Sequence, residues 1–125
     1  MHRSKIGATL VDIPAEVYDR EVDFWAAAIG RPPIVDPSDP DYADFGQPVP
    51  GFGFMVQRVG APARLHLDIE ADDIDAEVAR LEALGAERVE AIQTWWVLRD
   101  PAGLLFCVIA VQDRTAFDAH ATTWP

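Results

Sequence analysis

The chain has 125 residues, of which half are apolar and a quarter are charged, so it is long enough for one folded domain with a buried core. Its 21 acidic residues outnumber its 10 basic residues and give a formal net charge of −11. Because such a surface repels phosphate backbones and anionic lipid head groups, we expect neither nucleic acid nor a membrane as a partner.

Cysteine content and hydropathy indicate the compartment. Cys107 is the single cysteine, so no disulfide forms within the chain, as is usual in a reducing compartment. The N-terminal residues lack the apolar core of a signal peptide, and no stretch approaches the roughly 20 apolar residues that a membrane span needs. These features predict a cytoplasmic protein.

The first part of the sequence predicts a strand followed by a helix. Residues 6–13 are mostly apolar and β-branched, and Pro14 suits the first turn of a helix because its missing N–H needs no partner there. Apolar side chains then recur at helical spacing, and Gly30 stands where a helix C-terminal glycine is expected. The stripe consists of Tyr18, Val22, Trp25 and Ile29.

The next segment favours short strands. Residues 31–50 hold six of the ten prolines, which excludes a long helix. Short edge strands near residues 33–36 and 42–46 are compatible with this composition, and strand character returns over residues 51–59. The first half of the chain therefore predicts one strand, one helix and three further strands.

Residues 64–70 alternate strictly between polar and apolar side chains, which is typical of a half-buried strand. We expect the apolar face to pack on a helix and the polar face to meet water or a wet cavity. The apolar face consists of Leu65, Leu67 and Ile69, and the polar face consists of Arg64, His66, Asp68 and Glu70.

A second helix follows this strand. Asp72 or Asp73 is placed to cap it, and helix capping with the helix dipole accounts for the acidic residues there better than a cation site does. Gly85 is expected to end the helix. Its buried stripe is predicted to consist of Ile74, Val78 and Leu81.

The remaining residues predict three strands and a tail. The strands are expected over residues 88–93, 95–99 and 104–111, with a turn over residues 100–103 where Pro and Gly take their favoured positions. Residues 112–125 are expected to form a polar tail, in which Phe117 and Trp124 are the candidate anchors.

The order of one strand, one helix and three strands therefore occurs twice. Module one spans about residues 6–60 and module two about residues 63–111, within a single domain over residues 1–125. A repeat of this size suggests two equivalent modules that close one sheet surface between them. The sequence predicts an α+β fold.

Three stretches of the sequence carry a family resemblance. Residues 24–30 are similar to the end of the first helix, residues 64–86 to the second strand and helix, and residues 95–108 to the final hairpin of one superfamily. The chain resembles, over about residues 6–111, the glyoxalase-like (vicinal oxygen chelate) superfamily, in its compact members of the glyoxalase, bleomycin resistance protein and dioxygenase type. The resemblance implies two βαβββ modules whose curled mixed sheets surround a central cavity, with the helices outside, and a homodimer.

Metal-dependent members of this superfamily take one ligand from each of four strands, and the resemblance implies a reduced set here. His66 matches the ligand position that opens the second half, and Gln57 lies near the closing-strand position of the first half. Cys107 falls where a glutamate is usual, and the first-strand position falls among residues 7–9, none of which is a good ligand. A stable divalent site normally needs three or four protein ligands, so glyoxalase I activity itself is not expected. Whether a divalent metal binds stays open.

His66 is the candidate catalytic residue. It is either a hydrogen-bonded structural histidine or a metal ligand or acid–base group at the cavity floor. For Cys107, a buried structural thiol is favoured. Adjacent tryptophans point to opposite faces of a strand, so one of the pair is expected to line the cavity. The candidate wall residues of the ligand pocket are Phe54, Gln57, Arg58, Asp68, Trp95 and Trp96.

These residues support two classes of function and leave a third open. The first is an enzyme with lyase, isomerase or dioxygenase chemistry that uses His66 as metal ligand or general base. The second is a protein that binds or sequesters a small molecule without chemistry, as the bleomycin-resistance members of the superfamily do. The third is a partner-binding module that uses sheet edges or an aromatic surface. A small molecule is the expected partner in the first two.

Overall fold

The computed structural model describes residues 1–125 and divides into two compact units. Unit 1 consists of residues 1–7 and 66–125, and unit 2 consists of residues 8–65. Strands β1 (His2–Pro14) and β4 (Arg64–Ala71) each contribute residues to both units. None of the helices combines the length and the apolar character that crossing a membrane requires.

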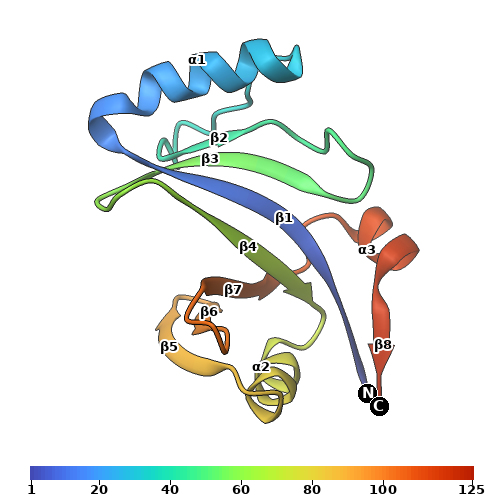
Figure 1. Ribbon diagram of the computed structural model, residues 1–125. Helices are drawn as coiled ribbons and strands as arrows, with labels where there is room; N and C mark the ends of the chain where they lie inside the picture. The colour runs from blue at the N-terminus through green and yellow to red at the C-terminus, as the bar shows by residue number, and fades with distance from the viewer. The chain divides into compact units, whose positions relative to one another are not determined.

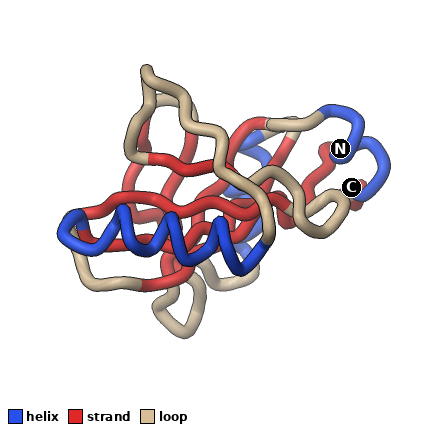
Figure 2. Tube along the Cα trace, turned by 90° about the horizontal axis from the view of Figure 1, so that it is seen from above, coloured by secondary structure: helices blue, strands red, loops and turns tan.

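Unit 2 is a three-stranded sheet covered by one helix. The C-terminal part of β1 pairs in parallel with β3 (Gly53–Val59), which pairs antiparallel with β2 (Tyr42–Asp44). A 3₁₀ turn (Ala15–Val17) leads into α1 (Tyr18–Ile29), which lies along the sheet (Figures 1 and 2). The helix ends at Gly30, whose φ of 83° lies in the left-handed region that favours glycine.

The core of unit 2 lies between this helix and this sheet. Val22, Trp25 and Ile29 pack against buried residues of the strands, so the helical stripe predicted from the spacing is confirmed. The buried residues are Val11, Ile13, Tyr18, Ala43, Phe45 and Val56.

Unit 1 is a mixed sheet with two helices. Its strand order is β8 (Thr122–Trp124), the N-terminal part of β1, β4, β7 (Leu105–Ala110), β6 (Trp95–Arg99) and β5 (Glu87–Ile92). β4 and β7 are parallel, whereas β7 with β6 and β6 with β5 are antiparallel. α2 (Ile74–Ala83) packs on this sheet through Val78, which is fully buried with Ala71, Leu98 and Val108 (Figure 1). The mixed pairing and the external helices confirm the predicted α+β class.

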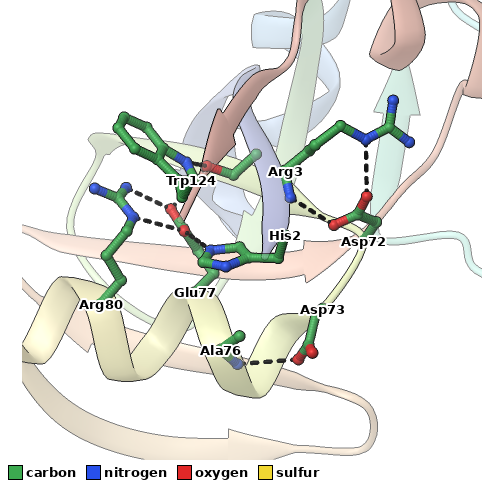
Figure 3. Close-up of polar contacts among 9 residues, drawn as sticks. His2, Arg3, Asp72, Asp73, Ala76, Glu77, Arg80 and Trp124 are labelled. Carbon is green, nitrogen blue, oxygen red and sulfur yellow. Dashed lines mark hydrogen bonds and ion pairs between the residues drawn. The ribbon is translucent and has the colours of Figure 1, made fainter.

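The helix α2 begins at an aspartate, as the sequence predicts. The Asp73 side chain accepts a hydrogen bond from the backbone N–H of Ala76 at 3.0 Å, so Asp73 is the N-cap (Figure 3). Asp72 instead accepts hydrogen bonds from the backbone N–H of Arg3 at 2.7 Å and from its Nε at 3.0 Å. One aspartate therefore starts the helix and its neighbour ties the helix start to β1.

The C-terminal residues differ from the expected polar tail. They form α3 (Arg114–His120) and β8, and β8 pairs antiparallel with β1, placing Trp124 opposite His2 beside the two chain ends (Figure 1). Phe117 is fully buried, so its predicted role as an anchor is confirmed. The sequence did not indicate these elements because each has a single aromatic residue, Phe117 or Trp124, among mostly polar or small residues.

The burial of β4 is the reverse of the expected pattern at its N-terminal end. Leu65 and Leu67 are 65% and 41% exposed, and only Ile69 packs against the α2 core. On the other face, Asp68 and Glu70 are 9% and 4% exposed. Alternation indicates that two faces differ, but the burial of each face depends on what the fold places against it.

Candidate functional site

Three side chains of unit 1 gather on one face of two neighbouring strands. His66 and Asp68 stand two residues apart on β4 and so share a face, and Cys107 on β7 lies opposite Asp68 in the parallel register. Their donor atoms, one nitrogen, one oxygen and one sulfur, all lie within 4.8 Å of one another. Of the residues predicted for the site, the structure brings these three together.

This cluster is largely withdrawn from solvent. The His66 and Asp68 side chains are 8% and 12% exposed, with His66 Nε2 3.6 Å from Asp68 Oδ1, and Cys107 is half-buried. Buried polar groups need partners, and here a carboxylate stands beside an imidazole and a thiol. The structural thiol expected for Cys107 thus has a histidine and a carboxylate as neighbours, which its apolar strand did not indicate.

The divalent metal that the resemblance implies fits this donor set. Imidazole nitrogen, carboxylate oxygen and thiolate sulfur are the ligand types of Zn²⁺, and three protein ligands leave a position open for a substrate oxygen or water. Thiolate also favours Zn²⁺ or Co²⁺ over the hard ions Mg²⁺ and Ca²⁺, which prefer all-oxygen sites. His66, Asp68 and Cys107 are the residues that would hold the ion.

Gln57 lies in unit 2, on the sheet face turned away from α1. It stands opposite both Asp12 on β1 and Tyr42 on β2, and its Nε2 donates a hydrogen bond to the Tyr42 hydroxyl at 2.9 Å. Beside it, Arg64 Nε donates to Asp12 Oδ2 at 3.1 Å, and Asp12 is 1% exposed. The metal-ligand role of Gln57 stays a prediction.

The other two predicted pocket residues of β3 face α1 instead. The Arg58 guanidinium lies 4.5 Å from the centre of the Tyr18 ring, and the two border a cavity of about 310 Å³. Burial raises the pKa of Tyr18. Phe54 packs against Trp25 at 5.2 Å between ring centres. Phe54 therefore belongs to the core of unit 2, since β3 turns its alternate side chains toward the helix.

Trp95 and Trp96 take opposite faces of β6, as expected. Trp96 packs with the α2 core and lies under the Arg88 guanidinium at 4.8 Å. Trp95 shares its face with Val97, which stands opposite Cys107, so Trp95 is the tryptophan on the face of the cluster. Both border a cavity of about 370 Å³, together with Gln93, Thr94 and the aspartates at the start of α2.

Sequence reasoning missed one buried ion pair and one pair in which only the carboxylate is buried. In unit 1, Lys5 Nζ lies 3.2 Å from Glu70 Oε2, and both side chains are almost fully buried. In unit 2, Asp12 pairs with Arg64. One feature of the sequence pointed to Glu70: it lies two residues after Asp68, on the same polar face of β4. Asp12 carried no signal, because a lone charge in an apolar strand does not identify its partner, and Lys5 lies outside the strand predicted over residues 6–13.

A family model described as a glyoxalase-like domain matches residues 8–109. Among curated proteins, none matches this chain.

Several solved structures share the fold at low sequence identity. A Mn(II)-bound glyoxalase from Novosphingobium aromaticivorans is 23% identical, with a TM-score of 0.62, over 90% of this chain and 43% of its own length. A methylmalonyl-CoA epimerase from Mycobacterium tuberculosis is 12% identical, with a TM-score of 0.63, over 89% and 90% of the two chains. A hypothetical protein from Bacillus halodurans C-125 is 9% identical, with a TM-score of 0.66, over 89% and 96%. The chain thus spans less than half of that glyoxalase but most of the other two proteins.

The family model matches most of this chain, and the three solved structures share its fold. This chain belongs to the glyoxalase-like domain family.

Proposed function

We propose that this protein is a small-molecule enzyme whose reactive centre is the cluster of His66, Asp68 and Cys107. The observation that supports this is the meeting of three different donor atoms within 4.8 Å on one largely buried sheet face. The proposed chemistry is that of a lyase, isomerase or dioxygenase acting on a ligand with neighbouring oxygen atoms. Two structural neighbours, a Mn(II)-bound glyoxalase and a methylmalonyl-CoA epimerase, support the proposal that this fold carries an enzyme here.

The ion, its ligands and Trp95 would each have a different role in the proposed reaction. A bound divalent ion would polarise a substrate oxygen and so stabilise negative charge that develops on it. His66, Asp68 and Cys107 would hold the ion, and the burial of the His66 and Asp68 side chains would limit the access of bulk water to it. Trp95, on the same face, offers an apolar wall against which a ligand can be oriented. Without an ion, the His66 imidazole would act as a general base, because imidazole accepts protons near neutral pH and the Asp68 carboxylate lies beside it.

Glyoxalase I activity is not part of this proposal. A cysteine stands where the resemblance places a glutamate, and Gly7, Ala8 and Thr9 supply no ligand on the first strand. The donor set therefore differs in kind from one built for a hard metal.

The second candidate is a protein that binds or sequesters a small molecule without converting it. The observation that favours it is the cavity of about 370 Å³ bordered by Trp95 and Trp96, since aromatic walls suit an aromatic ligand. In this case His66→Ala would leave ligand affinity nearly unchanged, and no product would form.

Metal content tests the proposal. We would measure it by elemental mass spectrometry on tag-free protein after incubation with Zn²⁺, Co²⁺, Mn²⁺, Ni²⁺ or Fe²⁺, for the wild type, His66→Ala and Cys107→Ser. His120→Ala is the matched control, because His120 is an exposed histidine of α3. We expect near-stoichiometric Zn²⁺ or Co²⁺ in the wild type and the control, and loss in the other two. Absence of every ion from the wild type would exclude the metal centre and favour the binding protein.

A further inference from the structure

The Glu70 side chain lies directly over the backbone of Gly7. A Cβ placed on Gly7 would overlap Glu70 Oε2 and would lie 2.7 Å from its Cδ. Gly7 lies inside β1, and its φ is not in the left-handed region, so its backbone conformation does not require glycine. What requires glycine here is space for the carboxylate of the neighbouring strand.

Both oxygens of this carboxylate are held. Oε1 accepts the backbone N–H of Gln112 at 2.8 Å, and Oε2 lies 3.2 Å from Lys5 Nζ. The Glu70 and Lys5 side chains are 5% and 6% exposed. A buried carboxylate with a charged partner and a backbone donor is fixed in position, because losing either contact leaves a buried charge unsatisfied.

Glu70 thus connects its strand to the elements on both sides. His66, Asp68 and Glu70 alternate on one face of β4. Through Lys5 and Gly7, the carboxylate ties β4 to β1, and through Gln112 it ties β4 to the residue two positions after β7. β7 carries Cys107 opposite Asp68. One side chain on β4 therefore contacts both β1 and the residues that follow β7, beside the paired segment of β4 and β7 that carries Asp68 and Cys107.

We propose that Glu70 is a positioning residue for the centre formed by His66, Asp68 and Cys107, and that Gly7 is the position that admits it. The inference rests on the proposed function, because it needs an ion at that centre. The distances between a metal ion and its ligand atoms must lie within about 0.2 Å of their usual values. Contacts that position the ligand side chains therefore affect the affinity for the metal. Changing such outer contacts typically weakens metal binding by about 10–100-fold.

Titration with Co²⁺ tests the inference without an assay of activity. The wild type is expected to bind Co²⁺ with the absorption of a cobalt–thiolate bond. Gly7→Ala is expected to weaken Co²⁺ binding by about 10–100-fold and to alter that absorption, because the methyl group displaces the Glu70 carboxylate. The matched control is Gly60→Ala, which adds the same methyl group where nothing lies within 4 Å. It is expected to bind as the wild type does.

A double-mutant cycle separates displacement of Glu70 from a local effect on β1. Glu70→Ala alone is expected to weaken Co²⁺ binding by about as much as Gly7→Ala. In the Glu70→Ala background, Gly7→Ala is expected to have almost no further effect, since the space is then empty. An equal loss from Gly7→Ala in both backgrounds would overturn the inference, because Gly7 would then act independently of Glu70.

Glu70→Gln keeps the inference testable if these variants fail to fold. It preserves the volume and the acceptor for Gln112 but removes the charge that faces Lys5, and circular dichroism checks that it folds. Folded Glu70→Gln is expected to bind Co²⁺ more weakly than the wild type, and wild-type Co²⁺ affinity and absorption in this variant would overturn the positioning role and leave the proposed centre intact. A wild type that binds neither Co²⁺ nor Zn²⁺ would overturn both.

Discussion

His2 and Glu77 form a buried pair, in which His2 Nε2 lies 2.7 Å from Glu77 Oε2 and the carboxylate is fully buried (Figure 3). The same carboxylate accepts hydrogen bonds from Ser4 Oγ at 2.9 Å and from Arg80 Nε and Nη2 at 2.9 and 2.8 Å. Trp124 contacts two of these residues, since its Nε1 donates to Ser4 Oγ and its ring centre lies 3.8 Å from the Arg80 guanidinium carbon. The first strand, α2 and the last strand of unit 1 therefore meet at one carboxylate.

Removing this carboxylate is expected to destabilise the protein strongly. Glu77→Ala would leave His2, Ser4 and Arg80 without their shared acceptor, and breaking a buried charged pair on one side costs about 3–5 kcal/mol of unfolding free energy. Urea denaturation measures this loss. Glu82→Ala is the matched control, because its pair with Arg88 is more than a third exposed, and it is expected to cost less than about 1 kcal/mol. Equal losses in the two variants would contradict the prediction.

The hydrogen bonds to the Glu77 carboxylate also predict that the stability of the protein depends on pH. Burial by itself would raise the pKa of Glu77, but hydrogen bonds from Arg80, His2 and Ser4 outweigh it and hold the pKa below its ordinary value of 4.5. A carboxylate with a depressed pKa contributes its stability above the unfolded-state value and loses it as the pH falls through the folded-state value.

Comparison with an isosteric variant isolates this effect. The difference in unfolding free energy between the wild type and Glu77→Gln is expected to be constant above about pH 5 and to shrink as the pH falls below about 4.5. Urea denaturation from pH 7 to pH 3 measures both proteins. A difference that stays constant down to pH 3 would show that Glu77 remains ionised or that its charge contributes nothing.

The C-terminal helix is expected to be an integral part of unit 1. Phe117 is fully buried, so Phe117→Ala should cost about 3–5 kcal/mol of unfolding free energy. Phe24→Ala serves as the control, because Phe24 is 58% exposed and should cost less than about 1 kcal/mol. If Phe117→Ala proved as mild as the control, α3 would not be docked as the structure shows.

The thiol of Cys107 is expected to report on the proposed metal centre. In the absence of metal, iodoacetamide should modify the half-buried thiol slowly, and one equivalent of Zn²⁺ should slow the reaction further because the thiolate becomes a ligand. In His66→Ala this protection should be weaker, whereas in His120→Ala it should match the wild type. Mass spectrometry of the alkylated protein follows the reaction. Equal rates with and without Zn²⁺ in the wild type would argue against Cys107 as a ligand.

The homodimer implied by the family resemblance is expected to show in solution. Size-exclusion chromatography with light scattering should then give a mass near twice 13.8 kDa. A mass near 13.8 kDa at all concentrations would contradict it.

Local spacing determined the helices α1 and α2 and the fold class of this protein. The stripe from Tyr18 to Ile29 predicted α1, and Gly30 ended it. Asp72 or Asp73 was expected to begin α2, and the structure shows that Asp73 does. Such signals lie within a few residues of the element they describe, because helix periodicity and capping depend on neighbours along the chain. Strand order and three motifs were then enough for the family resemblance.

Only the tertiary structure decided which side chains of the site meet. Cys107 stands beside Asp68 because β7 pairs with β4 in one register, and Glu70 lies over Gly7 because β4 neighbours β1. A sequence shows that β4 has a polar face but not what covers it, so the exposure of Leu67 and the burial of Glu70 could not be predicted. The physical reason is that the partners of a strand are distant in sequence, and a shift of one residue in its register would exchange the two faces.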